Sequence, residues 1–220
     1  MLAALRSSSD DRLRQAYLLL QHLRRLDERD DATHEDLIKA QKGMLFVSMY
    51  AALEYTVVSA VSDFLAELQA NAAAPSAYKS SLIPTLLNRE FNAIIGASKK
   101  TVWSHKLNLV RRLAAPDLCS IDNDVFPAES TNISADHLAS IWGQLCLPGA
   151  PLPPQATAWL INELKNHRNA IAHGRETASS IGGRFSVSQL EQRYAAVQAT
   201  CAHIVMAFEE HLDQRSYFIA

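Results

Sequence analysis

Helical spacing of apolar residues along nearly the whole chain is the feature that most limits its fold. The 220 residues include only 7 glycines and 8 prolines, and these lie mostly in the middle and late connections. Apolar positions recur every three or four residues, which is the pattern of helices that bury one face. We therefore predict an all-α bundle, folded as a single domain over residues 1–220.

Capping and chain-breaking residues set the predicted helix ends. Ser134 can cap a short helix, and Gly174 is expected to be a left-handed stop. Ser188 and Glu191 form a predicted capping box for the last helix. The predicted helices cover residues 10–29, 33–69, 76–97 with a break near Pro84, 99–114, 134–145, 155–173 and 188–214. Loops are expected over 116–131 and 148–154 and around Gly182 and Gly183. Residues 76–154 would form a helical elaboration between two helical hairpins.

Composition and charge argue against a protein that binds nucleic acid over its whole surface and against a disulfide-stabilised fold. Hydrophobic residues make up 48% of the chain, enough for a core, and the formal net charge is -2 with a pI near 6.4. A protein that binds nucleic acid over its whole surface is usually strongly basic, so any RNA contact here is expected to be local. Cys119, Cys146 and Cys201 are odd in number and far apart, which fits a reducing cytoplasm better than a disulfide framework.

No segment of the chain is expected to enter a membrane. The N-terminus lacks the apolar stretch of a secretory signal. The apolar run over residues 44–68 contains three carboxylates, so it is predicted to be a buried core helix rather than a membrane span. We therefore expect a cytoplasmic protein.

Residues 168–174 read RNAIAHG and carry the groups best suited to chemistry. Arg168 can bind a phosphate through its planar fork, and it keeps its charge at all relevant pH. An imidazole titrates near neutrality, so His173 can take or give a proton. Together these groups suit cleavage of RNA by its own 2'-hydroxyl, a reaction that requires no metal and no cofactor.

A helical projection of residues 155–173, at about 100° per residue, separates a core stripe from a polar face. The predicted core stripe consists of three aliphatic residues: Leu160, Leu164 and Ile171. The polar face carries four side chains that can hydrogen-bond or titrate: Asn162, Lys165, Asn169 and His173. Arg168 lies at the edge of this face, whereas His167 falls nearer the core stripe and is predicted to be structural. Basic residues near a helix C-terminus are also favoured by the helix dipole, so a purely structural role for the motif stays open.

Other candidate residues carry weaker signals. Glu54 lies inside an apolar run, where a carboxylate needs a partner, and it could orient Arg168 or His173 or bond to a helix end. Lys165 and Arg175 flank the motif and could bind RNA or belong to the solvated surface. A basic stretch could follow a phosphate backbone or be an exposed charged face: Lys99, Lys100, Lys106, Arg111 and Arg112. No histidine or cysteine spacing fits zinc, so no metal site is expected.

The string RNAIAHG resembles the signature of the HEPN superfamily (higher eukaryotes and prokaryotes nucleotide-binding domains). That signature is an arginine, a polar residue, three variable residues and a histidine. Residues 45–65, LFVSMYAALEYTVVSAVSDFL, resemble the early helix of bacterial toxin- and defence-associated members. Residues 131–147, TNISADHLASIWGQLCL, resemble the middle of the same group. The resemblance covers most of residues 35–215 and implies a four-helix bundle with additional helices inserted between its two hairpins.

This resemblance implies a metal-independent endoribonuclease of a toxin–antitoxin or phage-defence system. The implied partners are RNA, a second copy bound through the motif helix with a composite active site, and a cognate antitoxin protein. By the same resemblance, His173 is the general acid or base, Arg168 stabilises the scissile phosphate and Asn169 orients the groove. Two alternatives stay open. One is a non-catalytic HEPN module that binds RNA, a nucleotide or a protein, and the other is a helical scaffold that only mediates interactions.

Overall fold

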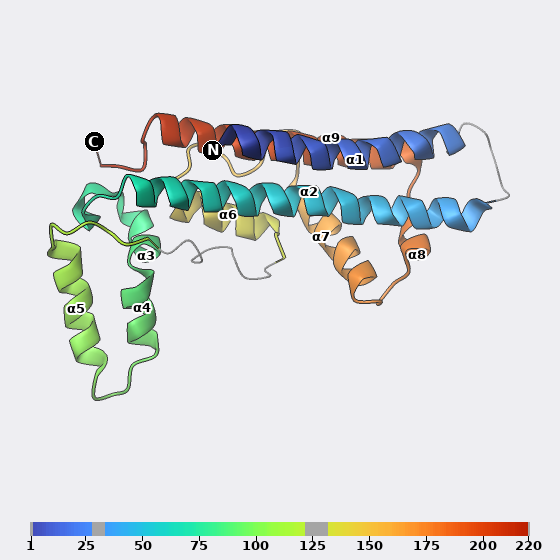
Figure 1. Ribbon diagram of the computed structural model, residues 1–220. Coiled ribbons are helices and arrows are strands. Elements are labelled where there is room, and N and C mark those ends of the chain that lie inside the picture. The colour runs from blue at the N-terminus through green and yellow to red at the C-terminus, as the bar shows by residue number, and fades with distance from the viewer. Residues whose placement is uncertain (1, 28–33, 122–131, 220) are drawn as a thin grey trace. The chain divides into compact units, whose positions relative to one another are not determined.

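The fold is helical throughout the part of the chain that the computed structural model describes, residues 2–27, 34–121 and 132–219 (Figure 1). The α-helices are α1 (Leu2–Asp27), α2 (Glu35–Ala70), α3 (Ile83–Leu86), α4 (Asn88–Ile95), α5 (Val102–Ala114), α6 (Ala135–Gln144), α7 (Ala158–Ala172), α8 (Ala178–Gly182) and α9 (Val187–Asp213). Two short 3-10 turns, Pro75–Ala77 and Ser80–Leu82, precede α3. These described ranges contain no strand, only an isolated bridge between Tyr78 and Phe218. The all-α prediction is confirmed.

The helices belong to two compact units, each assembled from segments that are far apart in the chain. The first unit contains residues 1–57, 132–138 and 150–206, and therefore α1, the first part of α2, α7, α8 and most of α9. The second contains residues 58–131, 139–149 and 207–220. Because α2 and α9 contribute to both, neither unit is one continuous piece of sequence.

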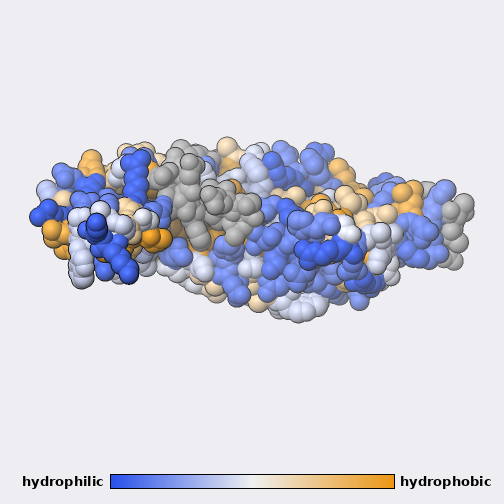
Figure 2. All heavy atoms as spheres, turned by 90° about the horizontal axis from the view of Figure 1, so that it is seen from below, coloured by the Kyte–Doolittle hydropathy of each residue, from blue (hydrophilic) through white to orange (hydrophobic). Residues whose placement is uncertain are grey.

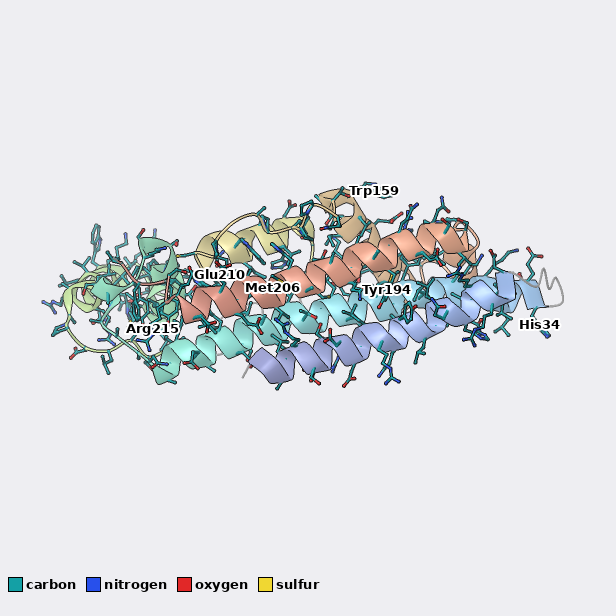
Figure 3. The ribbon with its side chains drawn as sticks, turned by 90° about the horizontal axis from the view of Figure 1, so that it is seen from above. His34, Trp159, Tyr194, Met206, Glu210 and Arg215 are labelled. Atoms are coloured by element: carbon teal, nitrogen blue, oxygen red, sulfur yellow. The ribbon has the colours of Figure 1, made fainter. Side chains whose placement is uncertain are left out.

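In the first unit, α1 packs against both α2 and α9 (Figures 1 and 3). The Ser9 and Thr56 hydroxyls share a buried hydrogen bond of 2.7 Å between α1 and α2. The hydroxyl of Tyr194, labelled in Figure 3, donates to the Leu13 carbonyl at 3.2 Å and joins α9 to α1. An unpartnered buried hydroxyl is unfavourable, so these bonds also set the register of α1 along its neighbours.

Two glycines let α8 lie directly on the backbone of α2. A Cβ atom at Gly43 would collide with the Ala178 carbonyl, and one at Gly182 would collide with the Lys39 carbonyl. Gly182 is the last residue of α8, so the loop expected there is wrong. Gly183 is the C-cap and lies in the turn that follows, as expected. A helix of five residues has little stability of its own, so the packing against α2 accounts for it.

The caps of the helices agree with the sequence in two places and differ in one. The Ser134 hydroxyl accepts the His137 N–H at 3.2 Å, which confirms the predicted N-cap of α6. At α9, the Ser186 hydroxyl accepts the Gln189 N–H at 3.2 Å, and the Gln189 side chain accepts the Ser186 N–H at 2.9 Å. The capping box thus lies two residues before the predicted Ser188 position, because Ser-x-x-Gln serves the same purpose as Ser-x-x-Glu. The predicted stop at Gly174 is the second place of agreement, since this glycine has a positive φ.

The helix boundaries also show where the sequence prediction was coarse. Helix α1 begins at Leu2, well before the predicted residue 10, while α2 ends at Ala70, next to the predicted residue 69. The helix expected over residues 76–97 is divided into two 3-10 turns, α3 and α4, and Pro84 lies in the first turn of α3. Proline is well tolerated there, since that N–H would have no helical partner. The predicted helix start at residue 33 and residues 122–131 of the predicted loop lie outside the described residues.

An aromatic cluster around the end of α9 holds the second unit together. His211 is buried, and its Nε2 donates to the Leu145 carbonyl at 2.8 Å. Its ring stacks on Phe64 with centroids 5.3 Å apart, and it meets Tyr217 edge-on at 5.6 Å. Burial lowers the pKa of His211, so the neutral imidazole is the form that this unit favours.

Among the described helices, α2 is the one whose length and composition would suit a membrane span. More than half of the residues in its most apolar stretch are buried within the protein. That degree of burial is typical of the core helix that the sequence predicts.

Candidate functional site

The motif helix α7 ends in a complete Schellman turn. His173 is the C-cap, and Gly174 follows with φ of +66°, a left-handed conformation that glycine adopts readily. The Arg175 N–H donates to the Ala170 carbonyl at 2.9 Å, and the Gly174 N–H donates to the Ile171 carbonyl at 3.1 Å. These two bonds satisfy carbonyls that the helix leaves open at its end. The predicted stop at Gly174 is confirmed.

This turn places His173 at the surface. Its side chain is exposed, and it makes no hydrogen bond or ion pair with any other residue in the described ranges. An imidazole in this position is accessible to a ligand or to a second molecule.

The core face of α7 is rotated from the predicted stripe. Ile161 and Leu164 are buried, whereas Leu160 and Ile171 are only half-buried. The expectation of a single stripe over Leu160, Leu164 and Ile171 is therefore wrong for two of its three members. The reason is that α7 contacts both α2 and α9, so it buries a different arc from a helix with one neighbour.

Arg168 is held by side-chain oxygens from three segments of the chain. Its Nη1 donates to Asn132 Oδ1 at 3.2 Å and to Asn169 Oδ1 at 2.9 Å. Its Nη2 donates to Glu54 Oε2 of α2 at 3.3 Å, and the Arg168 and Glu54 side chains are 28% and 31% exposed. A guanidinium has about five N–H donors, so two are left unused by these three bonds. The result is an oriented cation that can still bind a ligand.

The ring of Tyr50 supports this guanidinium from α2. Arg168 Cζ lies 4.9 Å from the ring centroid, a distance typical of a cation–π interaction. Burial, and next the negative charge of Glu54, raise the pKa of Tyr50 to about 12, so the ring stays neutral. The hydroxyl is buried near Glu54 and the main chain of Ile133, but it makes no well-aligned hydrogen bond with the described residues.

The structure brings together three of the predicted site residues: Glu54, Arg168 and Asn169. Of the roles left open for Glu54, the structure has the carboxylate bound to Arg168. His173 lies five residues further along the chain at the end of α7. Lys165 is half-buried on α7 and Arg175 is exposed beyond Gly174, and neither side chain bonds to this cluster within the described ranges.

Sequence reasoning missed two members of the cluster, Tyr50 and Asn132. A signal existed for Tyr50, because it precedes Glu54 by four residues and therefore shares its face of α2. Asn132 had no such signal, since it lies outside any helix and meets Arg168 across 36 residues of sequence. Only tertiary structure places it there.

A second charged pair lies on the side of α7 that faces α9. Arg193 Nε and Nη2 donate to Glu163 Oε2 and Oε1 at 2.8 and 2.9 Å, and both side chains are 11% exposed. His167 packs edge-on against Phe46 and Phe185, with centroids 4.8 and 5.5 Å away. Burial lowers the pKa of His167, and its packing fits the structural role that the sequence predicts.

Metal-binding side chains do not cluster in the described part of the chain. It contains no group of three or more histidine, cysteine, aspartate or glutamate residues placed to hold an ion. All three cysteines are free, and burial raises the pKa of the Cys201 thiol to about 12. A thiol in that state is neither a good ligand nor a nucleophile.

Comparison with known proteins adds the family. The chain matches the RiboL-PSP-HEPN family over residues 10–210, a span that contains His173 and every residue around Arg168. No match was found among curated proteins or among solved structures. HEPN domains commonly act as ribonucleases. From this match, which covers most of its length, the chain belongs to the RiboL-PSP-HEPN family and thus to the HEPN superfamily.

Proposed function

We propose that the protein is a metal-independent endoribonuclease whose site is built on the end of α7. One observation carries the proposal: an oriented arginine with unused donors and an exposed histidine stand at the same helix terminus. The arginine can stabilise charge that develops on a phosphate, and the histidine can transfer a proton. The family match supports this chemistry.

The proposed reaction breaks one P–O bond and forms another. A base removes the proton of a ribose 2'-hydroxyl, and the 2'-oxygen attacks the adjacent phosphorus. The bond from phosphorus to the 5'-oxygen breaks, and that oxygen takes a proton from an acid. The products are a 2',3'-cyclic phosphate and a 5'-hydroxyl. His173 would transfer protons, Arg168 would stabilise the phosphate oxygens, and Asn169 would keep the guanidinium oriented through its 2.9 Å bond.

The same proposal includes a homodimer in which two α7 ends meet. The reaction needs both an acid and a base, and the exposed end of α7 offers one histidine, so a second copy can supply the other. Light scattering should then give the mass of two 24.3 kDa chains. The proposal also places the protein in a cytoplasmic toxin–antitoxin or phage-defence system, with an antitoxin protein as partner. In this proposal Lys165 and Arg175 contact the RNA.

A non-catalytic module that binds RNA, a nucleotide or a protein is the second candidate. The observation that favours it is the bond between Arg168 and Glu54, which offsets part of the positive charge of the guanidinium within a single chain. In this case a phosphate would bind beside Arg168 without reacting.

Cleavage of a labelled mixed-sequence RNA in EDTA tests the proposal. The wild-type protein should release fragments with 2',3'-cyclic phosphate ends. Arg168→Ala should slow cleavage by about 10²–10³-fold and His173→Ala by about 10²–10⁴-fold. Arg14→Ala, which removes an exposed cation from α1, is the matched control and should cleave like wild type.

The other outcomes separate the candidates. The binding module would be favoured if the wild-type protein bound RNA, Arg168→Ala did not bind it, and neither protein cleaved it. RNA that is neither bound nor cleaved would contradict the endoribonuclease and the RNA-binding form of the second candidate.

A further inference from the structure

The hairpin of α4 and α5, in the second unit, has large apolar side chains on its outside. Neither helix contains a fully buried residue. Trp103, Leu107 and Val110 of α5 are 73%, 50% and 60% exposed, and Ile95 at the end of α4 is 82% exposed. Figure 2 shows apolar and hydrophilic atoms side by side at its left end, over this hairpin. Large apolar side chains that gather on an exposed face are a feature of interaction sites.

The three exposed residues of α5 form one stripe along the helix. Their spacing of four and three residues keeps them within about 60° of one another around the helix axis. The opposite side of α5, with His105, Leu109 and Arg112, is half-buried. A narrow apolar ridge on an otherwise polar helix is typical of a helix that packs against another helix.

Cations border this stripe. They are exposed and have no carboxylate partner among the described residues: Lys99, Lys100, Lys106 and Arg111. The Lys106 ammonium lies 4.6 Å from the centroid of the Trp103 ring. No aspartate or glutamate occurs between Phe91 and Pro116. The surface therefore combines an apolar ridge with positive charge that nothing nearby on the same helices neutralises.

We propose that this face, Trp103, Leu107 and Val110 with their bordering cations, docks an acidic amphipathic helix of a partner protein. Aliphatic side chains of such a helix would cover the ridge, and its carboxylates would pair with the lysines and Arg111. This inference does not depend on ribonuclease activity.

Other occupants fit the surface less well. Two copies of this face would bring cations against cations, so self-association through it is unfavourable. RNA would pair with the cations and stack on Trp103, but it would leave Leu107 and Val110 uncovered. A bilayer would find little apolar area in a stripe this narrow.

The test uses a fluorescein-labelled synthetic helix of about 18 residues, with leucines on one face and glutamates on the other. Fluorescence anisotropy should show binding that weakens as salt is raised to about 0.3 M. Trp103→Ser with Leu107→Ser, and Lys106→Glu with Arg111→Glu, should each weaken binding at least about tenfold. Leu18→Ser, which alters an exposed leucine on α1, is the matched control and should bind like wild type.

Two further measurements make the result decisive. A probe with serine in place of leucine should bind at least about tenfold more weakly, and equal binding would overturn apolar docking. Failure of the leucine probe to bind folded protein, checked by circular dichroism, would also overturn the proposal. Two other probes are oligo-uridine and vesicles of phosphatidylcholine and phosphatidylglycerol at about 7:3. The proposal would also be overturned if either of them bound through these same residues while the acidic helix did not bind.

Discussion

Helix α7 carries two arginine–carboxylate pairs, and they differ in geometry. Toward α9, Arg193 and Glu163 form two bonds of 2.8 and 2.9 Å, and both side chains are 11% exposed. Toward α2, Arg168 gives Glu54 one bond of 3.3 Å, and its other bonds go to asparagines. The first pair is bidentate and desolvated, whereas the second is partly solvated and leaves donors unused. The same two residue types thus join helices in one place and orient an accessible cation in the other.

The largest difference between the pairs should appear in stability. Arg193→Leu leaves the Glu163 carboxylate buried and uncompensated, so it should lower the free energy of unfolding by about 3–5 kcal/mol. Arg168→Leu acts on a partly solvated pair and should lower it by less, about 1 kcal/mol. Urea unfolding of both variants measures this, and equal losses would remove the distinction.

Catalysis should depend on the second pair, Arg168 and Glu54. Glu54→Ala frees the Arg168 guanidinium and should reduce the rate of RNA cleavage by about tenfold or more, which corresponds to about 1.4 kcal/mol in the barrier. RNA affinity should change much less, because the cation itself remains. Glu54→Gln keeps a hydrogen-bond acceptor, so its cleavage rate should lie between those of the wild type and Glu54→Ala. Loss of affinity with unchanged turnover would mean that Glu54 does not position Arg168 for the reaction.

The stability of the protein should also depend on pH, through His167 on α7 and His211 on α9. Burial lowers the pKa of His167 and of His211 in the folded protein, so the unfolded chain binds protons first as the pH falls. Their contribution to stability is complete above the ordinary value of about 6.5 and is lost as the pH falls from there toward the lowered values. Each imidazole can contribute at most about 1.4 kcal/mol per pH unit.

Unfolding free energies between about pH 7.5 and 5 would measure this effect. His167→Phe keeps an aromatic ring against Phe46 and Phe185 and should flatten part of the pH dependence. The pH dependence that remains should include the contribution of His211. An unchanged slope in the variant would exclude His167 as a source.

An effect on stability smaller than that of Arg193→Leu is expected at the end of α7. Gly174→Ala meets no atom within 4 Å, so its effect comes from the left-handed backbone alone, about 1–2 kcal/mol. Gly174→Asn should lose less, since asparagine tolerates this conformation better. Thermal unfolding of the two variants compares them. If alanine were as stable as asparagine, the Schellman turn would not be what ends the helix.

Much of the fold and part of the site could be predicted from sequence. Apolar periodicity located the long helices, and the Ser134 cap and the Gly174 stop were found from local chemistry. The predicted core stripe of α7 failed because a projection does not show how many neighbours a helix has. The α9 cap shifted by two residues because two equivalent capping patterns overlap in the sequence.

The sequence by itself determined the helices and the order of Arg168, Asn169 and His173 along one helix end. These features depend on spacing, capping and backbone conformation within a few residues. Tertiary structure alone decided that Asn132 and Glu54 meet Arg168, and that Arg193 rather than another cation meets Glu163. These partners lie 36, 114 and 30 residues apart in the chain, and no local pattern encodes which distant side chains will meet. For that reason the chemistry-bearing residues, with Glu54 as one possible partner of Arg168, could be identified from sequence. The choice of Arg168 as the partner of Glu54 and the presence of Asn132 could not.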